Sequence, residues 1–135
     1  MSRSTKLATA AYILTYVACK APTQVTTDTI AEAVDDHPAR VRQIVAALVK
    51  GGVLKSVRGA NGGVVLTRPP EEINLRHVFE VVEDQPIISL ALKDGYKGWG
   101  TKCRVRPVVE QLYKEIESDS RKRMAGLSIA AMIGR

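Results

Sequence analysis

Apolar side chains recur every three or four residues through the first third of the chain, which is the spacing of one buried helix face. The pattern predicts a helix over 6–20, which Pro22 prevents from continuing. A second, short helix is expected after a threonine cap at 26–27. A third begins at Pro38, where the missing N–H costs least, and ends before Gly51. The positions expected to face the core are Leu7, Ala10, Ala11, Leu14, Val17, Ala18, Ile30, Ala33, Val34, Val41, Ile44, Val45, Leu48 and Val49.

A strand pattern follows these helices. Apolar residues predict strands over 53–58 and 64–68, separated by the glycine-rich turn 59–63 and stopped by Pro69-Pro70. Three helices followed by a glycine-tipped hairpin are typical of a winged helix-turn-helix, in which the second helix of the two-helix unit lies in the DNA major groove. We therefore expect a mainly α fold with a small β-hairpin wing.

The C-terminal part is predicted to be helical as well. A fourth helix is expected over 74–83, and the apolar run 86–92 fits a strand or a short helix. Residues 93–102 form a loop with three glycines. The segment from 104 to about 133 has the periodicity of one long helix, with a kink or frayed end where 117–120 interrupt the apolar stripe. The stripe consists of Val105, Val108, Val109, Leu112, Ile116, Met124, Leu127 and Ala131.

A long terminal helix has to bury its apolar stripe. A second subunit is the economical partner, because paired subunits read two half-sites of DNA, and folding back onto its own domain is the alternative. The predicted organisation is a winged helix-turn-helix over 1–83, a connecting loop and candidate sensor region over 84–103, and a dimerisation helix over 104–135, within one compact unit.

Charge is distributed unevenly along the chain. Between His37 and Pro70 there is no Asp or Glu, and the remaining chain carries fourteen basic and fourteen acidic residues, so the whole net charge of +6 lies in this one stretch. A localised positive field attracts a polyanion, here double-stranded DNA, although the helix taken alone would also fit an ordinary solvated face. The six basic residues are Arg40, Arg42, Lys50, Lys55, Arg58 and Arg68.

Composition sets the wider context. Hydrophobic residues make up 45% and aromatic residues 4% of the chain, so aliphatic side chains have to fill the core of a single domain. No run approaches the roughly 18 apolar residues of a membrane span, and the polar start 1–6 lacks a signal-peptide pattern. We therefore expect no membrane association and a cytoplasmic protein with free thiols. Cys19, on the apolar side of the first helix, is expected in the core.

Enzymatic and metal chemistry are not indicated. The chain contains no phosphate loop, nucleophile elbow or histidine–carboxylate constellation, so we expect no enzyme. The two histidines, His37 and His77, are forty residues apart and make no metal motif. His37 could cap the third helix or touch phosphate, but a solvated turn residue is the simpler interpretation. His77 is expected to be exposed or at an interface.

The predicted wing resembles that of a known family. The stretch 53–73, VLKSVRGANGGVVLTRPPEEI, is similar to the wing of the Rrf2 family, which contains the IscR, NsrR and CymR regulators. The family wing typically reads Leu-Val-Lys-Ser-Val-Arg-Gly-x-x-Gly-Gly, followed by Leu-Ala-Arg-Pro-Pro-Glu-Glu-Ile. The similarity extends from the first helix to the long last one. It implies a homodimer that binds specific DNA sites and usually represses transcription.

The resemblance also implies which side chains contact DNA. Arginine and glutamine offer paired donors for base edges, whereas lysines and further arginines suit phosphates. A role for Gly59, Gly62 and Gly63 in shaping the hairpin is as plausible as direct contact with DNA. The residues assigned are Arg40, Arg42 and Gln43 at the major groove, Arg58 with Asn61 at the wing, and Lys50, Lys55 and Arg68 at phosphates.

The chain departs from the family pattern in the sensor. Cluster-binding members carry three cysteines in the loop before the long helix, whereas this loop offers only Cys103, aligned with the last of them. An iron–sulfur cluster normally takes four ligands, so we expect no cofactor and a member of the cluster-free subgroup. A cluster held by ligands other than cysteine, or by ligands shared across a dimer, is the alternative. Cys103 precedes a helix N-terminus and lies near Lys102, Arg104 and Arg106, which favours the thiolate and makes it a candidate redox sensor. A buried packing cysteine near a dimer seam is the alternative.

Two other functions stay open on the sequence alone. A small-molecule effector could control the regulator, with Tyr96 and Trp99 lining its pocket. Alternatively, the winged helix could bind a protein rather than specific DNA. The lack of acidic residues over 37–70 argues against the second alternative, because phosphate contacts account for it directly.

Overall fold

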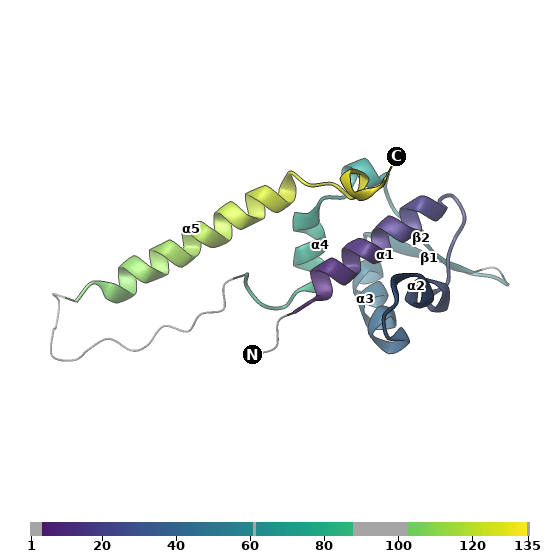
Figure 1. The fold of residues 1–135 in the computed structure, drawn as a ribbon, viewed down its shortest axis with the longest axis horizontal. Helices are drawn as coiled ribbons and strands as arrows, with labels where there is room; N and C mark the ends of the chain where they lie inside the picture. Colours follow the sequence, from purple (N-terminus) through teal and green to yellow (C-terminus); the bar gives the residue numbers. More distant parts are fainter. Residues whose placement is uncertain (1–3, 61, 88–102, 135) are drawn as a thin grey trace.

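The computed structural model describes residues 4–60, 62–87 and 103–134. Figure 1 shows α1–α4 and the hairpin packed together, with α5 extending away from them. The described helices include none that is long and apolar enough to cross a membrane. The elements are α1 (Lys6–Lys20), α2 (Thr27–Val34), α3 (Pro38–Lys50), β1 (Leu54–Val57), β2 (Gly63–Leu66), the 3-10 helix η1 (Pro70–Glu72), α4 (Leu75–Val82), α5 (Val105–Ala125) and the 3-10 helix η3 (Ile129–Met132).

Local side-chain signals set the ends of the helix-turn-helix. The hydroxyl of Thr26 accepts the backbone N–H of Thr29 at 3.2 Å and caps α2. His37 Nδ1 accepts the N–H of Ala39 at 3.2 Å and caps α3, with Pro38 in its first turn. Of the roles considered for His37, the structure therefore shows the cap.

The core lies between the first three helices, α4 and the hairpin. Ile13 is fully buried although the predicted stripe of α1 omitted it, whereas Ala11 and Ala18 are only half-buried. The prediction that Cys19 is a core residue is wrong, because its side chain is exposed. Cys19 lies two residues beyond buried Val17 and hence about 200° around the helix. The fully buried larger side chains are Ile13, Leu14, Val17, Ile30, Val41, Leu48, Val53, Leu54, Ile73, Val78 and Ile129.

The wing is an antiparallel hairpin tied to the loop before α2. Its register pairs Leu54 with Leu66 and Val57 with Gly63. Val25 and Val64 exchange backbone hydrogen bonds of 3.2 and 2.8 Å, so the hairpin is fixed against the helix-turn-helix. A Cβ on Gly63 would lie 2.4 Å from the carbonyl oxygen of Val25, which only glycine avoids. The glycine therefore has a structural reason in the wing, as the sequence suggested.

The last helix is shorter than predicted. Helix α5 runs without interruption through 117–120 and ends at Ala125, so the expected continuation to about 133 is wrong. After Gly126 the chain returns to the other helices, where the N–H of Ile129 donates to the carbonyl of Ile73 at 2.8 Å. Ile129 is fully buried. Glycine is a poor helix former, and burial of Ile129 stabilises the return. The tail after α5 thus folds back onto its own domain, whereas the cover of the α5 stripe by a second subunit stays a prediction.

Candidate nucleic-acid interface

Helix α3 has one buried and one exposed face. The buried face contributes Val41, Ile44, Val45 and Leu48 to the core. The exposed face carries Arg42, Gln43 and Lys50, with the small Ala39 and Ala46 on the same face. Short side chains between longer polar ones let the helix backbone approach another surface closely. This is the arrangement that a major-groove helix requires.

A groove separates α3 from the wing. Arg42, Ala46 and Lys50 lie along its helical wall, one turn apart, and Ser56 and Gly62 belong to its hairpin wall. The structure thus brings two of the predicted contact residues, Arg42 and Lys50, into one open surface. Gln43 is exposed on the same helix but does not line the groove.

The groove also contains residues that the sequence analysis did not assign to DNA. Thr26 and Thr27 line it at the beginning of α2, and Ser56 lines it from β1. Hydroxyl groups are common phosphate ligands. The paired threonines were visible in the sequence, but their spacing before an apolar run indicated only a helix cap.

The other predicted contacts belong to the hairpin. Lys55 is exposed on β1, Arg58 is exposed just after it, and Arg68 is exposed after β2. Asn61 lies outside the described residues. At the tip, Gly59 has a φ of +123°, and its carbonyl accepts the N–H of Gly62 at 3.0 Å. Arg58, directly before this turn, is exposed to solvent.

Most of these cations are available for an external anion. Within 4–60, 62–87 and 103–134, the side chains of Lys50, Lys55, Arg58 and Arg68 have no hydrogen-bond or ion-pair partner. Arg42 is 58% exposed and has only a 3.9 Å contact with exposed Asp28, a pair of little energetic weight. Phosphate oxygens could therefore bind these five cations without breaking a strong internal bond.

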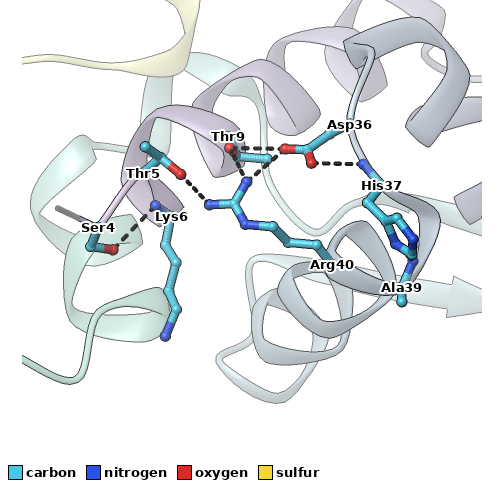
Figure 2. A network of polar contacts seen from close by, with 8 residues as sticks. All are labelled: Ser4, Thr5, Lys6, Thr9, Asp36, His37, Ala39 and Arg40. Atoms are coloured by element: carbon cyan, nitrogen blue, oxygen red, sulfur yellow. Dashed lines mark hydrogen bonds and ion pairs between the residues drawn. The ribbon is translucent and has the colours of Figure 1, made fainter. Parts of the chain in front are cut away.

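Arg40 has a different environment, although it is only two residues from Arg42. One terminal nitrogen, Nη1, donates to Asp36 Oδ2 at 2.6 Å and to the Thr9 hydroxyl at 2.9 Å. The other, Nη2, donates to the hydroxyl of Thr5. Figure 2 shows the guanidinium beside Thr5 and Thr9 at the start of α1 and Asp36 from the turn between α2 and α3. The structure thus places Arg40 between helices rather than on the exposed face with Arg42.

Asp36 holds this network together from the turn between α2 and α3. Its Oδ1 accepts the N–H of His37 at 2.7 Å, and its Oδ2 binds Arg40. The hydrogen bond from His37, together with Arg40 and the Thr9 hydroxyl, keeps the pKa of this carboxyl below its ordinary value of 3.8, against partial burial that raises it. Asp36 is therefore ionised at neutral pH.

Cys103 lies just before α5. Arg104 is the cap residue of this helix, and Cys103 directly precedes it. The thiol is half-buried and not in a disulfide. Arg106 donates to Glu110 at 2.9 Å along the same helix. Lys102, Tyr96 and Trp99, which the sequence placed near the sensor, lie outside the described residues, as does most of the apolar run 86–92.

Comparison with known proteins assigns the chain to a family. The sequence profile described as Rrf2, iron-dependent transcriptional regulator, matches residues 3–135. The chain belongs to the Rrf2 family. The resemblance found in the wing is thereby confirmed, and the protein is a transcription regulator with a DNA-binding winged helix.

Solved structures of Rrf2 regulators share the whole fold. IscR of T. potens superposes with a TM-score of 0.73 at 24% identity, covering 98% of this chain and 85% of that one. CymR, the global cysteine regulator of B. subtilis, gives 0.73 at 22% identity, covering 98% and 95%. The oxidised form of Staphylococcus aureus CymR gives 0.72 at 24% identity, covering 100% and 98%. The winged-helix architecture predicted from the sequence is therefore confirmed.

A curated relative matches a shorter segment. Protein aau3 of Rhizobium meliloti (strain 1021) is 38% identical over 61 residues, which are 45% of this chain. The matched segment covers 37% of that relative's own length.

The donor set does not fit the iron in the family's description. The described residues contain no group of three or more His, Cys, Asp or Glu side chains that could hold a metal ion. The whole chain has two cysteines, and Cys19 is exposed on α1 while Cys103 precedes α5. Protein-bound iron–sulfur clusters normally use four side-chain ligands, so these two thiols fall short.

Proposed function

We propose that this Rrf2-family protein is a homodimeric repressor that binds a pseudo-palindromic DNA site through α3 and the wing. The observation that carries the proposal is the exposed surface of unpaired cations on these two elements. In the proposed complex, Arg42 and Gln43 contact base edges in the major groove. Arg58 and Asn61 contact the adjacent groove from the wing, and the remaining basic residues of the surface, Lys50, Lys55 and Arg68, neutralise phosphates.

The exposed stripe of α5 supports a dimer. Val105, Val108 and Leu112 are 65%, 59% and 49% exposed, and their spacing of three and four residues is that of a coiled-coil seam. The helix has 21 residues and none of them is buried. Water contact along such a seam is unfavourable, and the same helix of a second subunit can cover it. A two-fold dimer would place two α3 helices on one face of the DNA.

In this proposal the dimer represses transcription by occupying its DNA site. A dimer that spans two half-sites covers the DNA between them, and at a promoter this excludes the transcription machinery. The proposed control point is Cys103, because it sits at the junction with α5, and no iron–sulfur cluster is invoked. Hydrogen peroxide would oxidise the Cys103 thiol to a sulfenic acid and be reduced to water.

The primary experiment selects DNA rather than assuming a site. Wild-type protein is incubated with random-sequence duplexes, bound duplexes are sequenced, and the affinity for the enriched duplex is measured against salt. We expect an inverted repeat with half-sites about 10–10.5 base pairs apart, or a multiple of that. Affinity should fall steeply as salt rises, because each neutralised phosphate releases a counterion. Failure to enrich any sequence, or binding indifferent to salt, would contradict the proposal.

Matched variants separate the roles of the contact residues. Gln43→Ala should relax the preference at one position of each half-site by about 1–3 kcal/mol. Lys50→Ala should weaken all duplexes alike and reduce the salt slope of the dimer by about two, one for each subunit. Peroxide treatment of wild type and Cys103→Ser tests the control point. Loss of binding in wild type alone supports Cys103, whereas loss in neither protein favours a small-molecule signal.

A further inference from the structure

We infer that Arg40 does not contact DNA but positions the recognition helix α3, through a clamp formed with Asp36, Thr5 and Thr9. The inference rests on the proposed DNA binding and changes the role that the sequence suggested for Arg40. The clamp joins three parts of the molecule: the first turn of α1, the turn between α2 and α3, and the first half of α3 (Figure 2).

Three of the five N–H donors of the Arg40 guanidinium already bind oxygens inside the protein. Both terminal nitrogens of its guanidinium donate to protein oxygens, and its side chain is only 32% exposed. A paired contact with guanine would have to use the same planar guanidinium, which faces Thr5, Thr9 and Asp36 (Figure 2). Reaching a base would therefore break an ion pair and two hydrogen bonds to hydroxyls. Arg42 needs no such rearrangement, because residues two apart point to nearly opposite sides of a helix.

The clamp also satisfies a buried hydroxyl. Thr9 is 8% exposed and is the buried polar residue among those described. Its hydroxyl accepts from Arg40 and lies 3.4 Å from Asp36 Oδ2, to which it donates. A buried polar group without a partner is costly, so the hydroxyl favours the one arrangement of α3 that presents Arg40 to it.

The clamp acts on the part of α3 that reads DNA. In helix-turn-helix proteins the N-terminal half of the recognition helix contacts the bases. Arg42 and Gln43 directly follow Arg40 in that half. Apolar packing of α3 is non-directional, whereas the planar guanidinium fixes both distance and angle to α1. Loss of the clamp should therefore displace the base-reading side chains while leaving phosphate attraction intact.

Removing the Asp36 carboxylate changes DNA affinity in opposite directions under the two explanations of its role. If electrostatics alone mattered, removing this negative charge near the DNA would strengthen binding to every duplex, and it would also free Arg40 for a phosphate. If the carboxylate positions α3, removing it weakens binding to the selected sequence. The two explanations thus predict opposite changes for Asp36→Ala.

The experiment compares the selected duplex with a shuffled duplex of equal composition, using Asp36→Ala, Thr9→Val and Arg40→Ala. We expect each variant to bind the selected duplex about tenfold more weakly, the loss of roughly one base contact, and the shuffled duplex within about twofold of wild type. Thr15→Val is the matched control, since it makes the same replacement on α1 outside the clamp. It should change neither affinity.

Salt dependence separates positioning from phosphate contact. Arg40→Ala should keep the wild-type salt slope, whereas Lys50→Ala should lower it by about two, one for each subunit of the dimer. The inference is overturned if Asp36→Ala binds more tightly, if Arg40→Ala loses the same slope as Lys50→Ala, or if Thr9→Val leaves the preference for the selected duplex unchanged. Circular dichroism checks that each variant is folded, and Thr9→Val changes no charge and keeps the side-chain volume. If the wild-type protein binds the selected and the shuffled duplex equally well, the proposed function itself is overturned.

Discussion

The winged body, residues 4–87, and the long helix α5 have similar apolar periodicity but opposite burial. Leu14 and Leu48 of the body are completely buried, whereas Val108 and Leu112 of α5 are largely exposed. Both regions satisfy the same helical pattern in the sequence. The difference shows that an amphipathic pattern identifies the face to be covered but not the molecule that covers it. In the body the cover is the chain itself, and for α5 we propose a second subunit.

The largest expected effect concerns the exposed stripe of α5. Val108→Asp combined with Leu112→Asp would bring four carboxylates into the seam of a dimer. The dimer dissociation constant should rise more than roughly a thousandfold, because unpaired charges are costly to bury. Analytical ultracentrifugation measures the change. The control Gln111→Asp with Ser118→Asp adds the same charges beside the stripe rather than within it, where they stay in water, and should weaken the dimer far less. Equal dimer dissociation constants for the two double variants would show that α5 does not form the dimer interface.

The second prediction compares single leucines in the two regions. Leu48→Ala should lower the free energy of unfolding by about 2–5 kcal/mol, because it leaves a cavity in the core. Leu112→Ala, measured at protein concentrations where subunits are separate, should cost less than about 0.5 kcal/mol. Urea unfolding gives both values. A large loss for Leu112→Ala in separate subunits would mean that its own chain covers α5.

The third prediction concerns the contact between the two regions. Arg121 of α5 lies 3.3 Å from Glu80 and 3.9 Å from Glu117, and its guanidinium is 5.3 Å from the ring centre of Phe79 on α4. Arg121→Met should therefore destabilise the chain by about 1 kcal/mol. Exposed Lys114, in the middle of α5, provides the control. Thermal unfolding of Lys114→Met should match wild type, and a matching Arg121→Met would exclude an anchoring role.

The smallest expected effect is a pH dependence of stability, and it arises within the winged body. The N–H of His37, with Arg40, lowers the folded-state pKa of Asp36 below the ordinary 3.8. Its stabilising contribution is therefore complete above that ordinary value and is lost as the pH falls through the lower folded value. The difference in unfolding free energy between wild type and Asp36→Asn should shrink below pH 3.8. A difference that grows on acidification would contradict the direction of the shift.

Much of the fold was predictable because its signals are local. Pro22 and Pro38 mark helix ends through a missing N–H, and Thr26 caps a helix with its own hydroxyl. The glycine-rich turn likewise predicted the wing. Errors arose where the outcome depended on distant partners. Cys19 looked apolar by its neighbours in sequence, and the terminal tail bends back because Ile129 is buried beside Ile73.

The sequence by itself determined the basic stretch, the helix-turn-helix and wing, and the family they belong to, since charge, period and turn residues are properties of short segments. Only the tertiary structure separated Arg40 from Arg42. Both arginines were assigned to the major groove. Their spacing turns them to different sides of the helix, but it does not say which of the two meets other parts of the protein. Their environments differ because Thr5 and Thr9, more than thirty residues earlier, meet Arg40 in space while Arg42 stays at the open groove. Contacts between segments distant in sequence are set by packing, which no local pattern contains.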